Sequence, residues 1–188
     1  MSISQAEIRA TIRRYLDIYP EESGNLQVLI RSVENRPNLW SRKTYPMHIT
    51  CSAAVVDDLG QVLVIHNLAL DRWLLPGGHI EPSDFNLVAA CLRELREESS
   101  INSQLAVSPS GLDTTPIDID IHEIPANPKK SEPEHMHADF RYVFRTLYQR
   151  VEVQDEEIGA YAWRRPRDLH TLRLVQKITE LADQPFAV

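Results

Sequence analysis

The sequence predicts a fold that combines helices and strands around one core, in the α/β class and of the α+β kind. Three observations lead to this class: an N-terminal segment with apolar residues at helical spacing, later segments that are rich in branched residues or alternate apolar with polar, and an amphipathic stretch without Gly or Pro among them. The 188 residues, of which 43% are hydrophobic, suffice for one ordinary domain with its own core and a short extension.

The first helix is predicted over residues 4–18, where apolar side chains recur every three or four positions. Ser4 and Glu7 have the spacing of a capping box, in which each side chain bonds the other residue's backbone. Residues 26–33 repeat the helical rhythm until Pro37 stops it. We therefore expect an N-terminal helical hairpin, which either covers a cleft or forms a dimer surface.

A β-hairpin is predicted next, because residues 48–57 and 61–67 are apolar and branched and are separated by the turn residues Asp58-Leu59-Gly60. Trp73–Leu75 predicts a short strand. It runs into Pro76-Gly77-Gly78, which we expect to be a loop because Pro and Gly disfavour both helices and central strands.

Residues 85–181 also predict both helices and strands. Residues 85–99 contain no Gly or Pro and carry an apolar stripe at helical spacing, which predicts a helix. Residues 117–122 and 137–148 alternate, so that each predicted strand has one apolar face and one polar face with acidic and imidazole groups. A strand over 158–163 and a helix over 172–181 are predicted to end the chain.

Composition excludes several classes of function. The formal net charge is −7 and no run of five basic residues occurs, which disfavours non-specific nucleic-acid binding. Cys51 and Cys91 are the two cysteines, so neither a disulfide framework nor a four-cysteine zinc site is expected. Because the chain begins without an apolar signal segment and has no long apolar stretch, we expect a soluble, unprocessed, cytoplasmic protein without membrane partners.

The three carboxylates of Glu94, Glu97 and Glu98 are predicted to lie on one face of the helix, because their spacing is i, i+3 and i+4. Like charges at this spacing cost about 0.2–0.5 kcal/mol per pair. One interpretation is a solvated face on which Arg93 and Arg96 offset the repulsion. The other is a metal site that uses the clustered negative charge.

The sequence upstream of this helix favours the metal site. The bare backbone at Gly77 and Gly78 can approach a ligand closely and direct a carbonyl at a cation. Carboxylate and carbonyl oxygens suit Mg²⁺ or Mn²⁺ better than zinc, and Mg²⁺ is commonly shared with substrate phosphates. The pattern therefore points to hydrolysis of a phosphoanhydride.

The segment Gly78–Ile101 resembles the signature box of the Nudix hydrolases, which reads Gly, five residues, Glu, seven residues, then Arg-Glu-aliphatic-x-Glu-Glu-x-Gly-aliphatic. The part from Arg93 to Glu98 is intact. Asp84 stands in place of the first Glu, eight residues instead of seven separate it from Arg93, and Ser100 replaces the second Gly. Because these departures fall in the loop and past the helix end, we expect lower stability at most.

The resemblance implies a Nudix-like α/β/α sandwich with a mixed sheet over residues 46–188, preceded by the helical extension at 1–45. It implies that Mg²⁺ or Mn²⁺ binds the metal ligands, that Arg93 orients the carboxylates, and that a general base comes from the box or from a distant loop. The metal ligands are Gly77, Glu94, Glu97 and Glu98. The candidate catalytic residues are Arg93, Glu97, Glu98 and Glu157. Glu157 and its neighbour Glu156 are the loop candidates for the general base.

A second group of residues is predicted to bind substrate, because His and Arg side chains suit phosphate and ribose hydroxyls. Two alternatives stay open for the group on the strand 137–148: an exposed polar sheet face, and a zinc site formed by His135, His137 and Asp139. Trp73 either stacks on a base or belongs to the core. The candidate substrate-binding residues are His79, Glu81, His135, His137, Asp139 and Arg141.

The function that the resemblance implies is a divalent-metal-dependent pyrophosphohydrolase. Its substrate would be a nucleoside diphosphate linked to another moiety, such as a nucleotide sugar, ADP-ribose or a nucleoside triphosphate. The expected partner is thus a small-molecule nucleotide; nucleic acid is not expected except as capped RNA, and a homodimer is compatible with the sequence. The alternative is a non-catalytic nucleotide sensor with the same fold.

Overall fold

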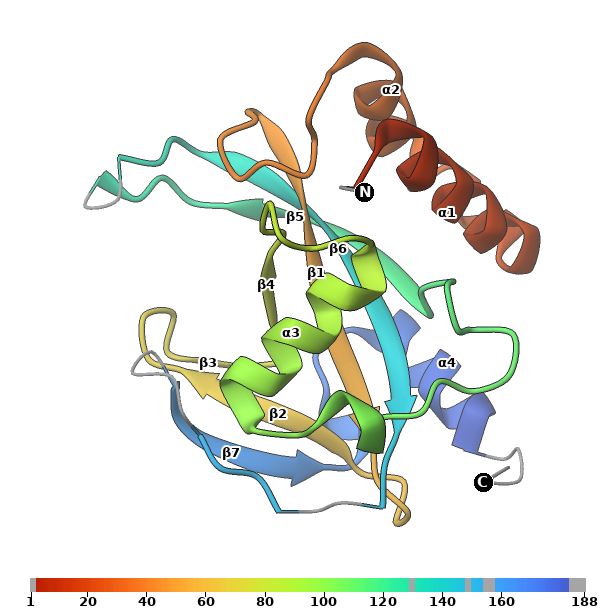
Figure 1. Ribbon diagram of the computed structural model, residues 1–188, viewed down its shortest axis with the longest axis vertical. Helices are drawn as coiled ribbons and strands as arrows, with labels where there is room; N and C mark the ends of the chain where they lie inside the picture. Colours follow the sequence, from red (N-terminus) through yellow and green to blue (C-terminus); the bar gives the residue numbers. More distant parts are fainter. Residues whose placement is uncertain (1–2, 129–130, 148–149, 154–157, 183–188) are drawn as a thin grey trace.

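A mixed sheet organises the computed structural model, which describes residues 3–128, 131–147, 150–153 and 158–182. Seven strands form this sheet in the order β3-β2-β1-β6-β5, while β4 pairs with β1 and β7 pairs with β2 (Figure 1). The helices and strands are α1 (Gln5–Ile18), α2 (Gln27–Asn35), β1 (Met47–Val56), β2 (Val62–Asn67), β3 (Arg72–Leu74), β4 (Gly77–His79), α3 (Leu87–Ser99), β5 (Asp118–Ile124), β6 (His135–Arg145), β7 (Ile158–Arg164) and α4 (Leu172–Ala182).

Strand β1 is the centre of the sheet. It pairs in parallel with β6 from Met47↔Met136 to Val56↔Arg145, and antiparallel with β2 and β4. β5 adds to the other side of β6 in antiparallel register. Nearly every residue of β1 is buried, as expected for a strand covered on both faces.

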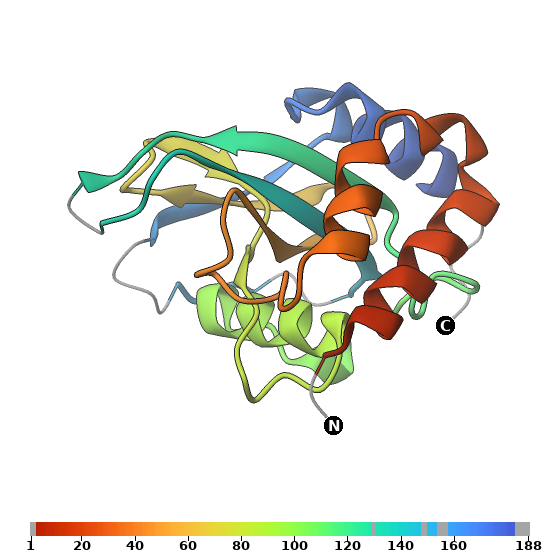
Figure 2. The same ribbon diagram turned by 90° about the horizontal axis from the view of Figure 1, so that it is seen from above.

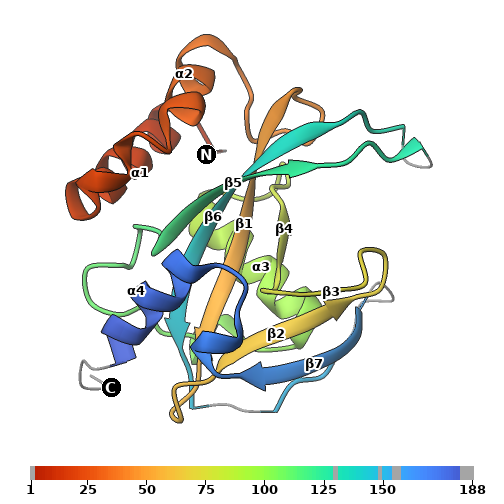
Figure 3. The ribbon, with the colours of Figure 1, turned by 180° about the vertical axis from the view of Figure 1, so that it is seen from behind.

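Two helices cover opposite faces of the sheet. α3 packs its apolar stripe on the face that holds Phe140 and Tyr142, whereas α4 covers Val143 on the other face. Figure 2 shows the sheet between α3 and α4, and Figure 3 shows α4 crossing the face opposite α3. The predicted α/β/α sandwich is therefore confirmed, and the alternation of β6 explains which side chains face each helix.

The predicted N-terminal helical hairpin is also confirmed. The backbone N–H of Glu7 donates to Ser4 Oγ at 3.2 Å, as a helix cap requires. The hairpin is joined to α4 through Lys177, whose ammonium donates to Tyr15 Oη at 2.7 Å and contacts Asp118 at 3.3 Å and Glu22. These buried polar contacts fix the extension against the sheet.

The prediction of a loop at Gly77-Gly78 was wrong, because these residues form β4. Gly78 is paired with Cys51 and Gly77 with Ser52 of β1. A Cβ atom at Gly77 would lie 2.5 Å from the backbone oxygen of Cys51, closer than real Cβ contacts allow. Glycine permits this strand because its lack of a side chain lets the two backbones approach.

The strand predicted over residues 137–148 differs at both ends. It begins earlier, at His135, because His135 is still paired with Ile124 of β5. It ends at Arg145, and Tyr148 lies outside the described residues. Within the described chain, no helix is long and apolar enough to span a membrane.

Candidate active site

Helix α3 carries the three predicted metal-binding carboxylates next to β4. The side chain of Asn86 caps the helix by accepting from Ala89 N, and Ser100 ends it in the left-handed conformation, with φ of 59°. Ser100 therefore takes the position where the family pattern has glycine. Glu94 projects from this helix toward Gly78, and Glu98 projects toward Gly77.

Two of these carboxylates are fixed by Gly77 and Gly78 of β4, which we call the glycine strand. Glu98 is buried and accepts a hydrogen bond from Gly77 N at 2.7 Å. Glu94 occupies the space above Gly78, where a Cβ atom would lie 2.6 Å from Glu94 Oε1. Burial raises the pKa of Glu94, while the neighbouring Arg93 opposes this shift. The absence of a side chain at Gly78 thus leaves a cradle for the Glu94 carboxylate. Any residue larger than glycine would occupy that space.

Arg93 connects the box loop to the carboxylates. Its Nε and Nη2 donate to the two oxygens of Asp84 at 3.1 and 3.0 Å, and Nη1 donates to Glu94 and Glu97 at 3.0 and 2.9 Å. Nη2 also donates to the backbone oxygen of His79 at 2.8 Å. Asp84 is buried and forms an ion pair with Arg93. It thus supplies a carboxylate at the position where the family pattern has Glu.

The residues of the box fit a hard divalent cation. The donor set consists of the carboxylate oxygens of Glu94, Glu97 and Glu98, and Glu94 fills the space left open because Gly78 has no side chain. Glu97 differs from its neighbours because 47% of its side chain is exposed. The three carboxylates are held by Arg93 and by the Gly77 amide in this structure.

The polar sides of β5, β6 and β1 meet on the sheet face that α4 covers in part. The strand register pairs His122 with His137 and His137 with His48 across the three strands. It similarly aligns Asp120 with Asp139. The polar faces predicted for residues 117–122 and 137–148 are thus neighbours in the sheet.

The alternative of an exposed polar sheet face was wrong for this region. Asp118 has no exposed surface, and Asp139 is 5% exposed. Arg141 lies between the acidic groups, with Nη1 donating to Asp118, Nη2 to Asp120 and Nε to Asp139 at 3.2, 2.8 and 3.0 Å. Because all three guanidinium nitrogens have carboxylate partners, these residues form a buried ionic network.

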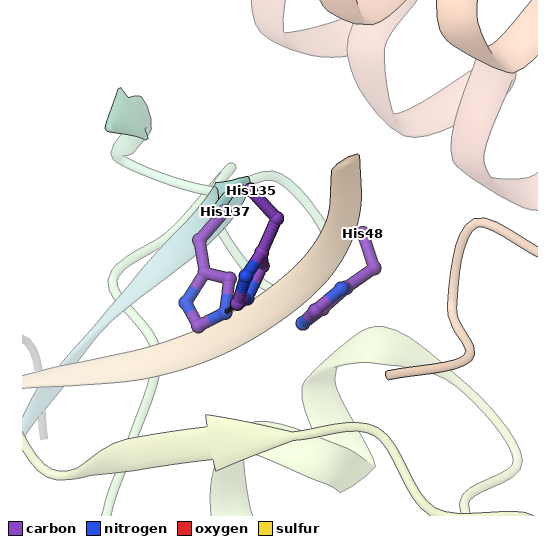
Figure 4. Close-up of side chains that lie close together, drawn as sticks. All are labelled: His48, His135 and His137. Carbon is purple, nitrogen blue, oxygen red and sulfur yellow. Dashed lines mark hydrogen bonds between the residues drawn. The ribbon is translucent and has the colours of Figure 1, made fainter. Parts of the chain in front are cut away.

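Asp139 does not join the two histidines with which it was considered as a zinc site. Its carboxylate accepts from Thr50 Oγ1 at 3.1 Å and Ser52 Oγ at 2.9 Å, and from Arg141. The third imidazole comes from His48 instead. Among the residues that the structure describes, the one group of three metal-ligand atoms within 4.8 Å of one another comes from His48, His135 and His137 (Figure 4).

Sequence reasoning missed His48, which lies in a strongly apolar segment. A signal was available in the alternation of residues 48–57, but only the parallel register of β1 with β6 brings His48 beside His137. Burial lowers the pKa of His48 to about 4 and that of His137 to about 2. Both imidazoles are therefore neutral at neutral pH.

The remaining predicted residues lie near the box or outside the described chain. His79 ends β4, and burial lowers its pKa to about 4. Glu81 has 56% of its side chain exposed, at 4.0 Å from Arg93 Nε. Glu157 lies outside the described residues, as does Glu156.

A cavity of about 100 Å³ opens beside the ionic network, between the sheet and the segment that leads into α4. Trp73, Arg141, Arg164 and His170 are among the residues that line it. The guanidinium carbon of Arg164 lies 4.4 Å from the ring centroid of Trp73, which is half-buried. An aromatic ring and a guanidinium group therefore line the same cavity.

Comparison with known proteins identifies the family. The family model described as NUDIX domain matches residues 46–184, which is most of the chain. The protein therefore belongs to the Nudix hydrolase superfamily.

A curated relative, the probable DHNTP pyrophosphohydrolase of Lactococcus lactis subsp. cremoris, is 34% identical over 82 residues. This match covers 44% of the chain and 45% of the relative, so it spans less than half of either protein.

Solved structures support the fold. The Escherichia coli dihydroneopterin triphosphate pyrophosphohydrolase is similar with a TM-score of 0.52 at 16% identity, over 71% of this chain and 94% of that chain. The Caenorhabditis elegans Ap4A hydrolase binary complex has a TM-score of 0.52 at 14% identity, over 71% and 96%. At these identities the likeness concerns the fold alone.

Proposed function

We propose that the protein is a divalent-metal-dependent pyrophosphohydrolase that cleaves a phosphoanhydride of a nucleoside diphosphate linked to another moiety. The observation that carries the proposal is the placement of Glu94 and Glu98 against the glycine strand, with Arg93 in contact with Glu94. Like-charged carboxylates on one helix face repel each other, and a bound divalent cation would offset this repulsion.

The cation ligands in this proposal are Glu94, Glu97, Glu98 and the carbonyl of Gly77, for Mg²⁺ or Mn²⁺. A bound divalent ion neutralises charge on phosphate oxygens and lowers the pKa of a coordinated water. Arg93 positions the carboxylates, since it contacts two of them and also holds the loop through Asp84.

The general base in this proposal is a carboxylate near the water nucleophile. Glu97 is supported by its exposure, which gives water access to its oxygens, and Glu98 by its fixed position at the Gly77 amide. Glu157 stays the candidate from the loop.

The nucleoside part of the substrate is assigned to the cavity that Trp73 and Arg164 line, and the phosphates to the box beside His79 and Glu81. Arg141 lines this cavity, and Asp139 positions it by accepting a hydrogen bond from its Nε. The names of the relatives suggest two substrates for testing: dihydroneopterin triphosphate and diadenosine tetraphosphate.

The experiment is a cleavage assay on nucleoside triphosphates, nucleotide sugars, ADP-ribose, capped RNA and these two compounds, with Mg²⁺, Mn²⁺ or EDTA. We expect cleavage that EDTA abolishes and that Glu98→Gln lowers by roughly 10²-fold or more, because the variant removes a charge from the cation site. Glu34→Gln, an equal change at an exposed position of α2, is the matched control and should keep full activity.

Two outcomes would refute the proposal. Near-normal turnover of Glu98→Gln would remove Glu98 from the site. If no compound is cleaved while nucleotides still raise the melting temperature, the protein is the non-catalytic nucleotide sensor considered from the sequence.

A further inference from the structure

Five of the seven histidines of the chain gather at one end of the sheet. They come from four different strands: His48 from β1, His79 from β4, His122 from β5, and His135 and His137 from β6. The strand register produces this arrangement, because His48, His137 and His122 occupy matching positions on three neighbouring strands. Figure 4 shows the rings of His48, His135 and His137 close together.

Backbone carbonyls determine which nitrogen of two rings is available. His135 Nδ1 lies 2.7 Å from the carbonyl oxygen of Pro133, and His48 Nδ1 lies 3.3 Å from that of Thr44. A carbonyl oxygen only accepts, so each Nδ1 carries a proton, and Nε2 is the nitrogen whose lone pair can bind a metal. A hydrogen bond from Nδ1–H to a carbonyl is the usual support of a histidine that binds a metal through Nε2.

The nitrogen spacing also matches a small coordination sphere. His135 Nε2 lies 3.1 Å from His137 Nε2, and His48 Nε2 lies 3.2 Å from His79 Nε2. The ligand atoms of His48, His135 and His137 all lie within 4.8 Å of one another. A tetrahedral ion with nitrogens at about 2.0–2.1 Å keeps them roughly 3.3 Å apart, so small side-chain movements suffice to form the site.

The geometry points to a site for a divalent transition-metal ion of the zinc class, bound by Nε2 of His48, His135 and His137. His79, whose Nε2 lies 3.2 Å from that of His48, is the candidate for a fourth nitrogen. An all-imidazole donor set selects Zn²⁺, Co²⁺, Ni²⁺ or Cu²⁺ over Mg²⁺, which prefers oxygen. This site is chemically separate from the oxygen-lined box, although His79 follows Gly78 directly and its carbonyl accepts from Arg93.

The protonation of the cluster is compatible with metal binding. Burial is the main cause that lowers the pKa of His48 and His79 to about 4 and that of His137 to about 2. Neutral imidazole is the form that ligates metal. Without a metal, N–H···N hydrogen bonds would join the rings in pairs. A metal titration distinguishes the hydrogen-bonded cluster from the metal-bound cluster.

The test is a titration of the metal-free full-length protein with Co²⁺ in the presence of millimolar Mg²⁺. We expect one equivalent to bind, to produce visible absorption of tetrahedral or five-coordinate Co²⁺, and to be displaced by one equivalent of Zn²⁺. His135→Ala should weaken binding at least 10²-fold. His66→Ala is the matched control, because His66 pairs with Asp71 away from the cluster, and it should bind as the unaltered protein does.

Glu98→Gln distinguishes the two metal sites, since it alters the box and leaves the five histidines in place. Its Co²⁺ titration should be unchanged even where nucleotide cleavage is lost. If His135→Ala fails to fold by circular dichroism, His137→Gln replaces it and should show the same loss. The inference is overturned if no visible band appears, if the histidine variant keeps its affinity, or if Glu98→Gln abolishes Co²⁺ binding.

Discussion

Replacing Gly78 with alanine tests the glycine cradle directly. The added Cβ would lie 2.6 Å from Glu94 Oε1, and its next contacts are also atoms of the Glu94 carboxylate. Ordinary van der Waals contact begins at 3.4 Å, so the carboxylate has to retreat by about 0.8 Å. The obstructing atoms are the end of a flexible side chain, and the backbone of β4 can therefore stay in place.

The expected cost falls mainly on activity. Misplacing a catalytic group by about 1 Å can lower the rate roughly 10²-fold, or about 2.7 kcal/mol of transition-state stabilisation. The free energy of unfolding should decrease by only about 1 kcal/mol, the lower end for an extra methyl group in a packed site. Activity and stability should thus separate in this variant.

The assay compares kcat/KM for the substrate found in the cleavage panel, the concentration of Mg²⁺ that gives half-maximal rate, and the urea unfolding curve. Gly24→Ala is the matched control, because its backbone is helical and nothing lies within 4 Å of the added Cβ. It should keep full activity and gain up to about 1 kcal/mol of stability. Unchanged kcat/KM in Gly78→Ala would refute the role assigned to the cradle.

Two further predictions concern the ion pairs. Asp118→Asn should lower the free energy of unfolding by about 3–5 kcal/mol in urea, because it leaves buried Lys177 and the neighbouring guanidinium groups without their shared anion. Arg42→Ala, which breaks an exposed pair with Glu132, should cost less than about 1 kcal/mol, and equal losses would contradict the argument. Arg93→Lys should lower kcat/KM at least tenfold, because an ammonium cannot reproduce the forked contacts of the guanidinium. The value of kcat/KM should stay low at saturating Mg²⁺. Wild-type kinetics in this variant would show that Arg93 does not position the carboxylates.

The sequence was sufficient for most elements and for one half of the candidate site. Periodicity located both N-terminal helices and α3, since a helix brings residues three and four apart onto one face whatever the surroundings. The same local rule placed Glu94, Glu97 and Glu98 together. The glycine strand was missed because residue preferences describe glycine as a strand breaker, and only the neighbouring β1 backbone gives it a reason to be there.

The other half of the site depends on contacts between strands that are distant in the sequence. His48 and His137 are 89 positions apart, and the parallel pairing of β1 with β6 makes them neighbours. Tertiary packing likewise converted a polar strand face into a buried network in which Arg141 is held by three aspartates. The sequence by itself thus determined the carboxylate face of α3 and the family signature, because both depend on short-range spacing. The tertiary structure alone decided the histidine cluster, since sheet register is set by the packing of the whole fold.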